Sequence, residues 1–376
     1  MKLSFWSSAV AFTVMVFAAM PLSSKTYDIP ILVPITGFLS LEGTAQRNGA
    51  VLALSEAPVG LTIRAQVADT ATSPEVAVNA LSRALSGDTP IAVAASMFGT
   101  QMLAMMPIAE RAGVPLLTVS GTAKLTELDN PFIFRFFPGD GVVKRAQADY
   151  AVTVLKAKRP ALIYQTTAYG QSGRAVLKEV LSEMGAPLVF EEALSPKVKD
   201  MLPALSRLQA SGADVILLHL HSGPSALVVR QAKALGMTHP ILGGSALHQP
   251  TTAALLQPAE LKNVCAESAS SPISESSPAF QRFTKTYQQT FGSAPDAFAL
   301  GQYDGMSMML AAVTAGADTA GKMRDWLATH RYQGLAMSYI SDGKGNMAHD
   351  AVIICYDGKS RVPNIRQRYQ NVDGKG

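Results

Sequence analysis

The chain has 376 residues, of which 48% are hydrophobic and 16% are charged, and its formal net charge is +4. This length predicts two domains, and this composition predicts buried cores rather than a disordered chain. The basic residues are scattered along the sequence, which excludes the basic face that nucleic-acid binding requires.

The first two dozen residues differ from the rest of the chain. Lys2 precedes an almost wholly apolar run over residues 3–20, after which the sequence turns polar. This pattern is typical of a secretory signal peptide. We therefore expect residues 1–24 to be removed by cleavage between Ala19 and Ser24, although an uncleaved anchor is the alternative because no clean A-x-A site is present. No later apolar run is long enough to span a bilayer, and no cysteine lies near the signal end to carry a lipid anchor.

Strands and helices alternate in a first block after this segment. The second expected helix has a well-marked start, because Ser73 can cap it, Pro74 takes its first position and Glu75 lies in its first turn. Strands are expected at 27–35, 61–68, 91–95, 114–119 and 132–137, and helices after Gly43, over TSPEVAVNALSRAL and at 102–112.

A second block repeats this alternation. Strands are expected at 160–164, 188–192, 214–220 and 240–243, and helices at 142–156, 174–184, 200–210 and 226–235. Two such blocks predict an α/β fold with two parallel-sheet lobes.

The last part of the chain departs from the alternation. The run ESASSPISESSPAF predicts a crossover between the lobes, and helices are expected at 279–291 and 296–315. The run SDGKGNMAHDAVIICYDGKSRV predicts a β-hairpin because of its Asp-Gly and Gly-Lys turn residues. The polar tail from Pro363 onwards is expected to be loosely held.

A strand–helix–strand unit over residues 91–122 indicates where a ligand could bind. Its two strands must be parallel, so their carboxyl ends open on one edge of the sheet, which is where ligands bind in open α/β sheets. The small and polar residues expected at that edge are Gly99, Thr100, Ser120, Gly121 and Thr122. The alternative is that they are ordinary loop residues.

Residue patterns for catalysis are missing from the sequence. There is no G-x-S-x-G turn and no phosphate-binding loop, and the six histidines have no carboxylate at the spacing typical of metal ligands. We therefore expect neither an enzyme nor a bound metal or cofactor. The two cysteines, Cys265 and Cys355, could form one disulfide in an oxidising compartment or remain as buried thiols.

Several motifs together carry a family resemblance. They are PITG…EG…GAVLA, DTATSPEVA, PIAERAGVPLLTVSG followed by LT, FIFRFFPGD, AYGQSG, RQAKALG and the late YDG. In this order, and over nearly the whole mature chain, they resemble the solute-binding proteins of branched-chain amino-acid (Leu/Ile/Val-type) ABC transporters.

The resemblance implies a type I periplasmic binding fold, with two Rossmann-like lobes joined by three crossover strands. Residues 25–138 and 267–343 would form the first lobe, and 139–266 and 344–376 the second. It also implies a periplasmic monomer that traps a small carboxylate- or amide-bearing solute (an amino acid, or an aromatic or aliphatic acid) and delivers it to the permease subunits of an ABC importer in the inner membrane. The alternative is a ligand-sensing subunit that docks on a membrane receptor or kinase.

The resemblance also implies roles for particular residues. In the family, the loops matching residues 97–100 and 120–122 hold the ligand carboxylate through hydroxyls and backbone amides. Phe98 and Gly99 stand where serines are common, and Thr100 could replace the lost hydroxyl. Tyr169 matches a ligand-contacting tyrosine of the second lobe, and His221 lies where the family often has another aromatic residue.

Ser245 is the most informative departure. Amino-acid binders of this type carry an acid there that pairs with the substrate ammonium, and an ammonium buried without a counter-charge is costly. Together with Phe98, Tyr169, His221 and Tyr303 around the inferred cleft, this favours a carboxylate or amide with an apolar or aromatic body. Glu42 could supply the charge instead, or could be a solvated loop carboxylate.

Overall fold

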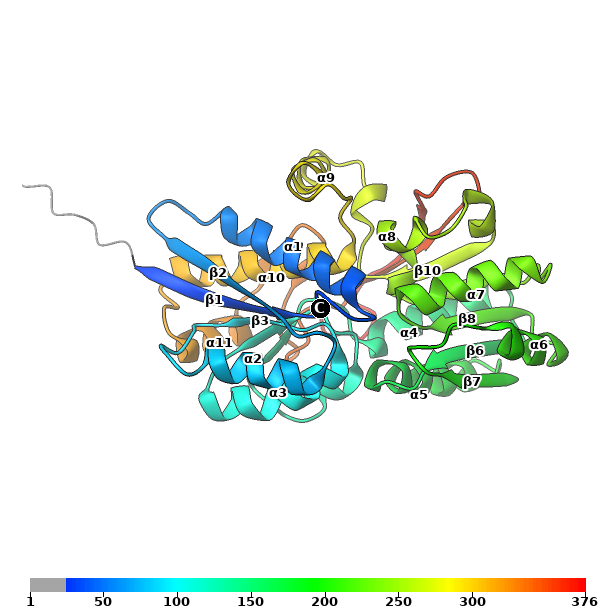
Figure 1. Ribbon diagram of the computed structural model, residues 1–376, viewed down its shortest axis with the longest axis horizontal. Coiled ribbons are helices and arrows are strands. Elements are labelled where there is room, and N and C mark those ends of the chain that lie inside the picture. Colours follow the sequence, from blue (N-terminus) through cyan, green and yellow to red (C-terminus); the bar gives the residue numbers. More distant parts are fainter. Residues whose placement is uncertain (1–24) are drawn as a thin grey trace, which may run out of the picture.

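The computed structural model describes residues 25–376, so the expected signal peptide, residues 1–24, lies outside the described residues. The chain forms two lobes that lie side by side along the long axis of the molecule (Figure 1). We call the lobe that begins with β1 lobe 1 and the other lobe 2. Over residues 25–376, no helix is both long and apolar enough to cross a membrane.

Lobe 1 contains a five-stranded parallel sheet in the order β2-β1-β3-β4-β5. Its strands are β1 (Thr26–Val33), β2 (Thr62–Asp69), β3 (Val93–Ala95), β4 (Leu116–Thr118) and β5 (Ile133–Arg135). Along β1, Ile29 and Ile31 pack on one face of the sheet, whereas Leu32 packs on the other. Helices cover both faces, which explains why the strands are apolar on both sides.

The helices of lobe 1 come from two separate parts of the chain. One face is covered by α2 (Pro74–Ala84) and α3 (Gly99–Ala112). The other face is covered by α1 (Ser40–Ser55), α10 (Ala297–Thr314) and α11 (Ala320–Thr329). Outside these, α9 (Pro278–Phe291) packs on α1 and α10, and β11 (Tyr332–Gln333) pairs with β12 (Ser338–Tyr339).

Lobe 2 contains a seven-stranded sheet in the order β14-β13-β10-β9-β8-β6-β7. Its parallel strands are β6 (Pro160–Gln165), β7 (Phe190–Leu194), β8 (Val215–His219), β9 (Ile241–Gly243) and β10 (Val264–Ser268). At one edge, β13 (Ala351–Cys355) and β14 (Asn364–Tyr369) run antiparallel to their neighbours. One face is covered by α4 (Asp140–Asp149) and α5 (Ala168–Glu183), and the other by α6 (Leu202–Ala210), α7 (Ser222–Ala234) and α8 (Pro250–Ala253).

The predicted helix start at Ser73 is confirmed. The Ser73 hydroxyl accepts a hydrogen bond from the Val76 amide, and Pro74 is the first residue of α2. At the other end of the neighbouring α3, Gly113 has a φ of +67° and stops the helix, as a left-handed residue does. These local signals fix where the helices of lobe 1 begin and end.

The chain passes between the lobes three times: after β5, after β10 and before β13. The expected two-lobed fold with three crossovers is therefore confirmed. The second passage follows β10, inside the run that the sequence analysis assigned to a crossover. The third passage is tied to the first, because the Arg135 amide donates to the Gly345 carbonyl and the Met347 amide donates to the Arg135 carbonyl.

Two expectations for the end of the chain are wrong. The tail beyond Pro363 is not loosely held, because residues 364–369 form β14. The expected hairpin also has a different partner strand, because β13 lies inside the predicted run but pairs with β14 beyond it. The polar sequence of β14 concealed the strand: it lies at the sheet edge, where backbone hydrogen bonds to β13 hold it and many side chains face water.

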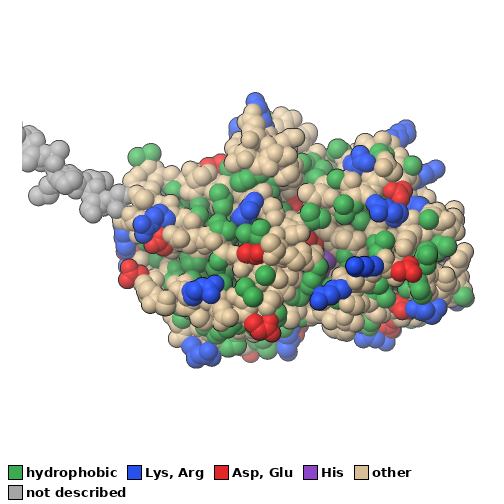
Figure 2. Space-filling view, viewed as in Figure 1, with side chains coloured by type: hydrophobic (Ala, Val, Ile, Leu, Met, Phe, Trp, Pro, Cys, Tyr) green, Lys and Arg blue, Asp and Glu red, His purple; other side chains and the backbone are tan. Residues whose placement is uncertain are grey.

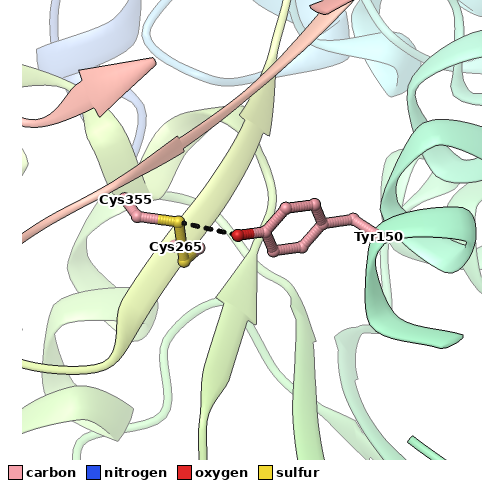
Figure 3. Close-up of a disulfide and its surroundings, with 3 residues drawn as sticks. All are labelled: Tyr150, Cys265 and Cys355. Carbon is pink, nitrogen blue, oxygen red and sulfur yellow. Dashed lines mark hydrogen bonds between the residues drawn. A yellow bond between two sulfur atoms is a disulfide. The ribbon is translucent and has the colours of Figure 1, made fainter. Parts of the chain in front are cut away.

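The two cysteines form a disulfide, so the first of the two alternatives is confirmed. Cys265 on β10 and Cys355 on β13 are directly opposite each other in an antiparallel pair, with their Cα atoms 4.0 Å apart. Figure 3 shows the hydroxyl of Tyr150 pointing at this bond, 3.6 Å from the Cys355 sulfur. The disulfide therefore joins two strands between which the chain leaves lobe 2 and returns.

Candidate functional site

The candidate site lies where the two lobes face each other. On the face seen in Figure 2, a histidine side chain shows at the junction of the lobes, and Lys and Arg side chains are spread over both lobes among acidic ones. The pocket at this junction is lined by Met97, Gly121, Phe137 and Phe298 from lobe 1 and by Asp140, Val143, Tyr169, His221, Ser245, Ala246 and Glu267 from lobe 2. Its volume is about 10 Å³, which is room for about one water molecule. The lobes are therefore closed on each other, and a larger solute can enter only if they separate.

The loop after β3 is held mainly by side chains of lobe 1 itself. The Met97 amide donates to the Gln46 side chain at 2.9 Å, and the Ser96 hydroxyl donates to the Gln101 side chain at 2.6 Å. At Gly99, an added Cβ would lie 2.0 Å from the Thr122 hydroxyl oxygen. Glycine at position 99, the departure noted above, thus allows the two site loops to approach each other.

The loop after β4 lines the pocket through Gly121 and carries a hydroxyl on either side of it. The side-chain oxygens of Ser120 and Thr122 are buried and have no hydrogen-bond partner among residues 25–376. The guanidinium of Arg135 lies behind this loop and donates to the Thr122 carbonyl at 2.7 Å and to the Ser120 carbonyl at 3.4 Å. Arg135 is 2% exposed, and burial lowers its pKa to about 10. This buried cation therefore fixes the loop without reaching into the pocket.

Asp140 brings a carboxyl group into the pocket from lobe 2. It is the first residue of α4, and its amide donates to the Gly121 carbonyl of lobe 1 at 2.7 Å. Neither carboxyl oxygen has a hydrogen-bond partner of normal geometry within the described part of the chain. Burial raises the pKa of Asp140 to about 7, while the nearby Lys144 charge and Ser172 hydroxyl lower it. Buried carboxylates are normally paired or hydrogen-bonded, so this group is poised to meet a donor.

Three rings pack together on the lobe 2 side of the pocket, and two of them, Tyr169 and His221, line it. The Tyr169 ring lies over His219 and His221, with centroid distances of 3.8 and 4.8 Å. His219 Nε2 lies 2.9 Å from the Tyr169 carbonyl, which can only accept, so this nitrogen carries the proton. Burial lowers the pKa of both histidines, that of His221 to about 3. Both are therefore neutral at pH 7 and add no positive charge beside Asp140.

The structure brings an acid to Ser245 that the local sequence lacks. The Ser245 hydroxyl donates to the Glu267 carboxylate at 2.7 Å, and its amide donates to the same group at 3.2 Å. Glu267 is also paired with Lys144 at 2.5 Å, and both side chains are fully buried. The absence of an acid at position 245 therefore does not mean that this end of the pocket lacks one, because β10 supplies it.

Glu42 is neither a solvated loop residue nor a lining residue of the pocket. It lies in the first turn of α1, is fully buried, and accepts hydrogen bonds from the Ser222 amide at 2.9 Å and the Ser222 hydroxyl at 2.6 Å. Because Ser222 belongs to lobe 2, this contact joins the lobes. Phe98 lies beside it, with its ring 6.2 Å from that of His221.

Besides Glu42, the predicted site residues that do not line this pocket are Phe98, Gly99, Thr100, Ser120, Thr122 and Tyr303. Tyr303 is on α10, with its ring against Phe283 and its hydroxyl donating to Glu56 at 2.5 Å on the outer side of lobe 1. Its placement in the cleft is wrong, because this position of α10 faces α9 rather than lobe 2. Thr100 is half-buried in the first turn of α3 and does not line the pocket.

Sequence analysis missed Asp140, Lys144 and Glu267. A signal existed for Asp140, since an acid that follows a strand and a glycine at the start of a helix lies at the ligand edge of a parallel sheet. Glu267 also had a signal, because it is the charged residue of the otherwise uncharged run VCAES. Lys144 had none, since its partner is 123 residues away in the sequence.

Comparisons with known proteins agree with this fold. An amino acid binding protein of Pseudomonas aeruginosa is 28% identical over 317 residues, which are 81% of this chain and 82% of that protein. The crystal structure of a leucine-binding protein of Thermotoga maritima has a TM-score of 0.84 at 23% identity and covers 92% of this chain and 99% of its own. A solute-binding protein of Rhodopseudomonas palustris, solved with 3,4-dihydroxybenzoic acid, has a TM-score of 0.83 at 20% identity, with 92% and 98% covered.

A family model described as periplasmic binding protein matches residues 26–359. This span includes both sheets except β14, all three crossovers and every residue of the pocket. The family expected from the sequence motifs is thus confirmed: the chain belongs to the periplasmic binding proteins, as a solute-binding protein of the branched-chain amino-acid type.

Proposed function

We propose that this chain captures an amino acid with a small apolar side chain between its lobes and delivers it to the permease subunits of an ABC importer. The protein would act in the periplasm as a monomer, after removal of residues 1–24. The lobes would divide at 138/139 and 343/344, as expected, with the middle boundary after β10 instead of at 266/267. The ligand class rests mainly on one observation, the Asp140 carboxyl.

A buried carboxyl that accepts no hydrogen bond of normal geometry within residues 25–376 favours a ligand with a positive, donating group. The two histidines beside it are neutral, and the Lys144 charge is already engaged by Glu267 and Gln147. A ligand ammonium would both donate hydrogen bonds to Asp140 and compensate its charge.

The lobe 1 side of the pocket suits the opposite end of an amino acid. Next to Gly121 and Met97, which line the pocket, the hydroxyls of Ser120 and Thr122 are buried donors, and the 14-residue helix α3 begins at Gly99 without a side-chain cap from the described residues. These groups do not line the closed pocket, so a ligand would reach them only after the lobes separate. A helix N-terminus carries partial positive charge and free amides, which favour an anionic group. A ligand carboxylate would therefore face lobe 1 while its ammonium faces lobe 2.

The remaining walls are apolar. Phe137 and Phe298 stack with their centroids 4.9 Å apart, and Met97 and Val143 lie beside them. These side chains favour an apolar ligand body and exclude water from the charged groups. The closed pocket must widen to hold any amino acid, and a short side chain requires the least widening.

An aromatic carboxylate is the second candidate. The rings of Phe38 and Phe98 lie 5.6 to 6.2 Å from each other and from His221, which lines the pocket, and such rings stack on aromatic ligands. One neighbour in fold was solved with 3,4-dihydroxybenzoic acid, whereas one relative is named an amino acid binding protein. A carboxylate without an ammonium would leave Asp140 without a cationic partner, so we place this candidate second.

Isothermal titration calorimetry can decide between the two. The panel is alanine, valine, leucine, isoleucine, benzoate and 3,4-dihydroxybenzoate, tested on the wild type and on Asp140→Asn. We expect one of the amino acids to bind most tightly and Asp140→Asn to weaken it at least about tenfold, since an unpaired charged hydrogen bond costs about 1.5–3 kcal/mol. The matched control is Asp318→Asn, which removes the same charge from an exposed ion pair with Lys25.

The opposite results would change the assignment. Tightest binding of an aromatic acid, unaffected or improved by Asp140→Asn, would establish the second candidate. Binding of an amino acid with equal affinity by wild type and Asp140→Asn would show that Asp140 does not hold the ammonium.

A further inference from the structure

Beside the pocket, four buried side chains form a continuous hydrogen-bonded chain across the closed lobes. Glu42 and Asp296 come from lobe 1, whereas Ser222 and Gln249 come from lobe 2. The Ser222 hydroxyl lies 2.6 Å from the Glu42 carboxyl and 2.6 Å from the Gln249 side-chain oxygen. The Gln249 side-chain nitrogen is hydrogen-bonded to the Asp296 carboxyl. None of the four side chains is more than 3% exposed.

The hydrogen bonds that link these four side chains need more hydrogen atoms than the serine hydroxyl and the glutamine amide can donate. There are three contacts: Glu42 to Ser222, Ser222 to Gln249, and Gln249 to Asp296. The serine hydroxyl supplies one hydrogen, and the glutamine amide supplies one through its nitrogen end, because its oxygen end can only accept. Two ionised carboxylates supply none. The third contact therefore requires a proton on one of the two carboxyls.

The count does not depend on the orientation of the Gln249 amide. With its oxygen toward Ser222, the serine donates to Gln249, the amide nitrogen donates to Asp296, and Glu42 must carry the proton. With the amide turned over, the nitrogen donates to Ser222, the serine donates to Glu42, and Asp296 must carry it. Each arrangement contains one carboxylic acid and one carboxylate.

We propose that Glu42, Ser222, Gln249 and Asp296 form a proton-linked latch, in which closing the lobes takes up one proton that is shared between the two carboxyl groups. The four are positioning residues: they hold the closed arrangement beside the pocket and do not line it. Separation of the lobes breaks the contact between Glu42 and Ser222 and lets water reach both acids, so the proton is then released.

The surroundings of the latch favour uptake of the proton. Burial raises the pKa of both Glu42 and Asp296, and the charge of Asp296 raises the pKa of Glu42 further. His221 Nδ1 lies 3.8 Å from Glu42, and His248 lies near Asp296, but burial lowers the pKa of both histidines. The remaining titratable groups that face the two acids are the phenols of Tyr169 and Tyr287, whose pKa values are raised, so both stay neutral.

The direction of the pH effect follows. In the open lobes the carboxyls titrate near their ordinary values of about 4, whereas one of them keeps its proton to higher pH in the closed state. At a pH between the carboxyl pKa of the open lobes and the higher pKa of the closed lobes, closing takes up one proton. The equilibrium constant for closing then rises up to about tenfold for each unit that the pH falls. This inference concerns the closed state and holds whichever solute the pocket takes.

The test measures closure without any solute. Fluorophores are attached to Val59→Cys in lobe 1 and Leu235→Cys in lobe 2, both at exposed positions; the described residues include no free native cysteine to compete. Single-molecule energy transfer then gives the closing constant between about pH 5 and 8, on protein stripped of bound solute by unfolding and refolding. All proteins carry Asp140→Asn, because burial of Asp140 would add a second proton to the closing step.

The decisive variants are Glu42→Gln and Asp296→Asn, each added to that parent. Either amide supplies the missing hydrogen without taking up a proton, whichever acid carries it in the native protein. We expect each variant to lose one proton of pH dependence relative to the parent, while the titration of His219 and His221 cancels in the comparison. Asp318→Asn, an exposed acid in lobe 1, is the control and should leave the slope unchanged.

Three results would overturn the latch. They are a parent whose closing constant does not change over this pH range, amide variants whose slope equals that of the parent, and an Asp318→Asn control that changes the slope as much as they do. Because no solute is present, these outcomes are independent of the calorimetric test of the ligand class.

Discussion

Asp140→Asn is expected to close the empty protein. In the closed lobes the Asp140 carboxyl is 1% exposed and has a pKa of about 7, whereas its ordinary value is 3.8. Separated lobes would hydrate the group and restore the ordinary value. At pH 8 the closed, empty protein must therefore hold an ionised carboxylate at a cost of up to about 4 kcal/mol, at 1.36 kcal/mol per pKa unit. Asparagine has the same shape and carries no charge, so the variant escapes this cost.

The size and sign of the effect can be measured directly. The labels at Val59→Cys and Leu235→Cys report the closing constant, which should rise by up to roughly a thousandfold at pH 8 on Asp140→Asn substitution. Because the closed state of the wild type keeps the proton up to about pH 7, its closing constant should fall as pH rises from about 4 to 7. Below pH 4 the wild type and the variant should converge.

An unchanged lobe separation in Asp140→Asn at pH 8 would refute this reasoning. It would mean that the positive charges of Lys144 and Arg135 stabilise the ionised Asp140 carboxylate in the closed state more strongly than its pKa of about 7 indicates. A small-angle scattering radius, measured without labels, should decrease in the variant and provides an independent check.

The remaining predictions concern stability and binding. Lys144→Met leaves Glu267 buried without its cation and should lower the free energy of unfolding by about 3–5 kcal/mol in a denaturant titration; a double variant with Glu267→Met that is no more stable than the single one would contradict this. Replacing Cys265 and Cys355 by serine opens a loop with a sequence separation of 90 and should lower the free energy of unfolding by about 4–5 kcal/mol. An unchanged denaturant midpoint would contradict this expectation. Tyr169→Ala should weaken solute binding by about 1–3 kcal/mol in calorimetry while leaving the melting temperature nearly unchanged.

Much of the fold could be predicted because its signals are local. Strands β1, β3, β4, β6, β8 and β9 are largely apolar runs, and most helices follow strands with caps such as Ser73 or stops such as Gly113. The misses lie where tertiary context decides: β14 is polar because it forms a sheet edge, and α11 is a short helix that sequence analysis left unassigned. Neither has the strong hydrophobic pattern that marks a buried element.

The site was predictable only in part, for a similar reason. Gly121, Tyr169, His221 and Ser245 could be placed from the loops that follow strands, and the structure brings all four to one pocket. The contact of Glu267 with Ser245 could not be placed in this way, because Glu267 reaches Ser245 from another strand. A local sequence that lacks an acid says nothing about an acid delivered by a neighbouring strand. The preference for a ligand without an ammonium group, which was drawn from Ser245, therefore loses its main support.

The Asp140 carboxyl connects ligand choice with lobe closure. At neutral pH an empty protein that closes must bury an uncompensated charge, so it is biased toward the open form, in which a solute can enter. An amino acid removes this bias, because its ammonium compensates the carboxylate. An aromatic acid does not, and closing around it would require Asp140 to take up a proton instead. The same group thus selects against the second candidate, and the two ligand classes differ in a measurable quantity: an aromatic acid should bind with uptake of one more proton than an amino acid. Calorimetry in two buffers of different ionisation enthalpy measures that number directly.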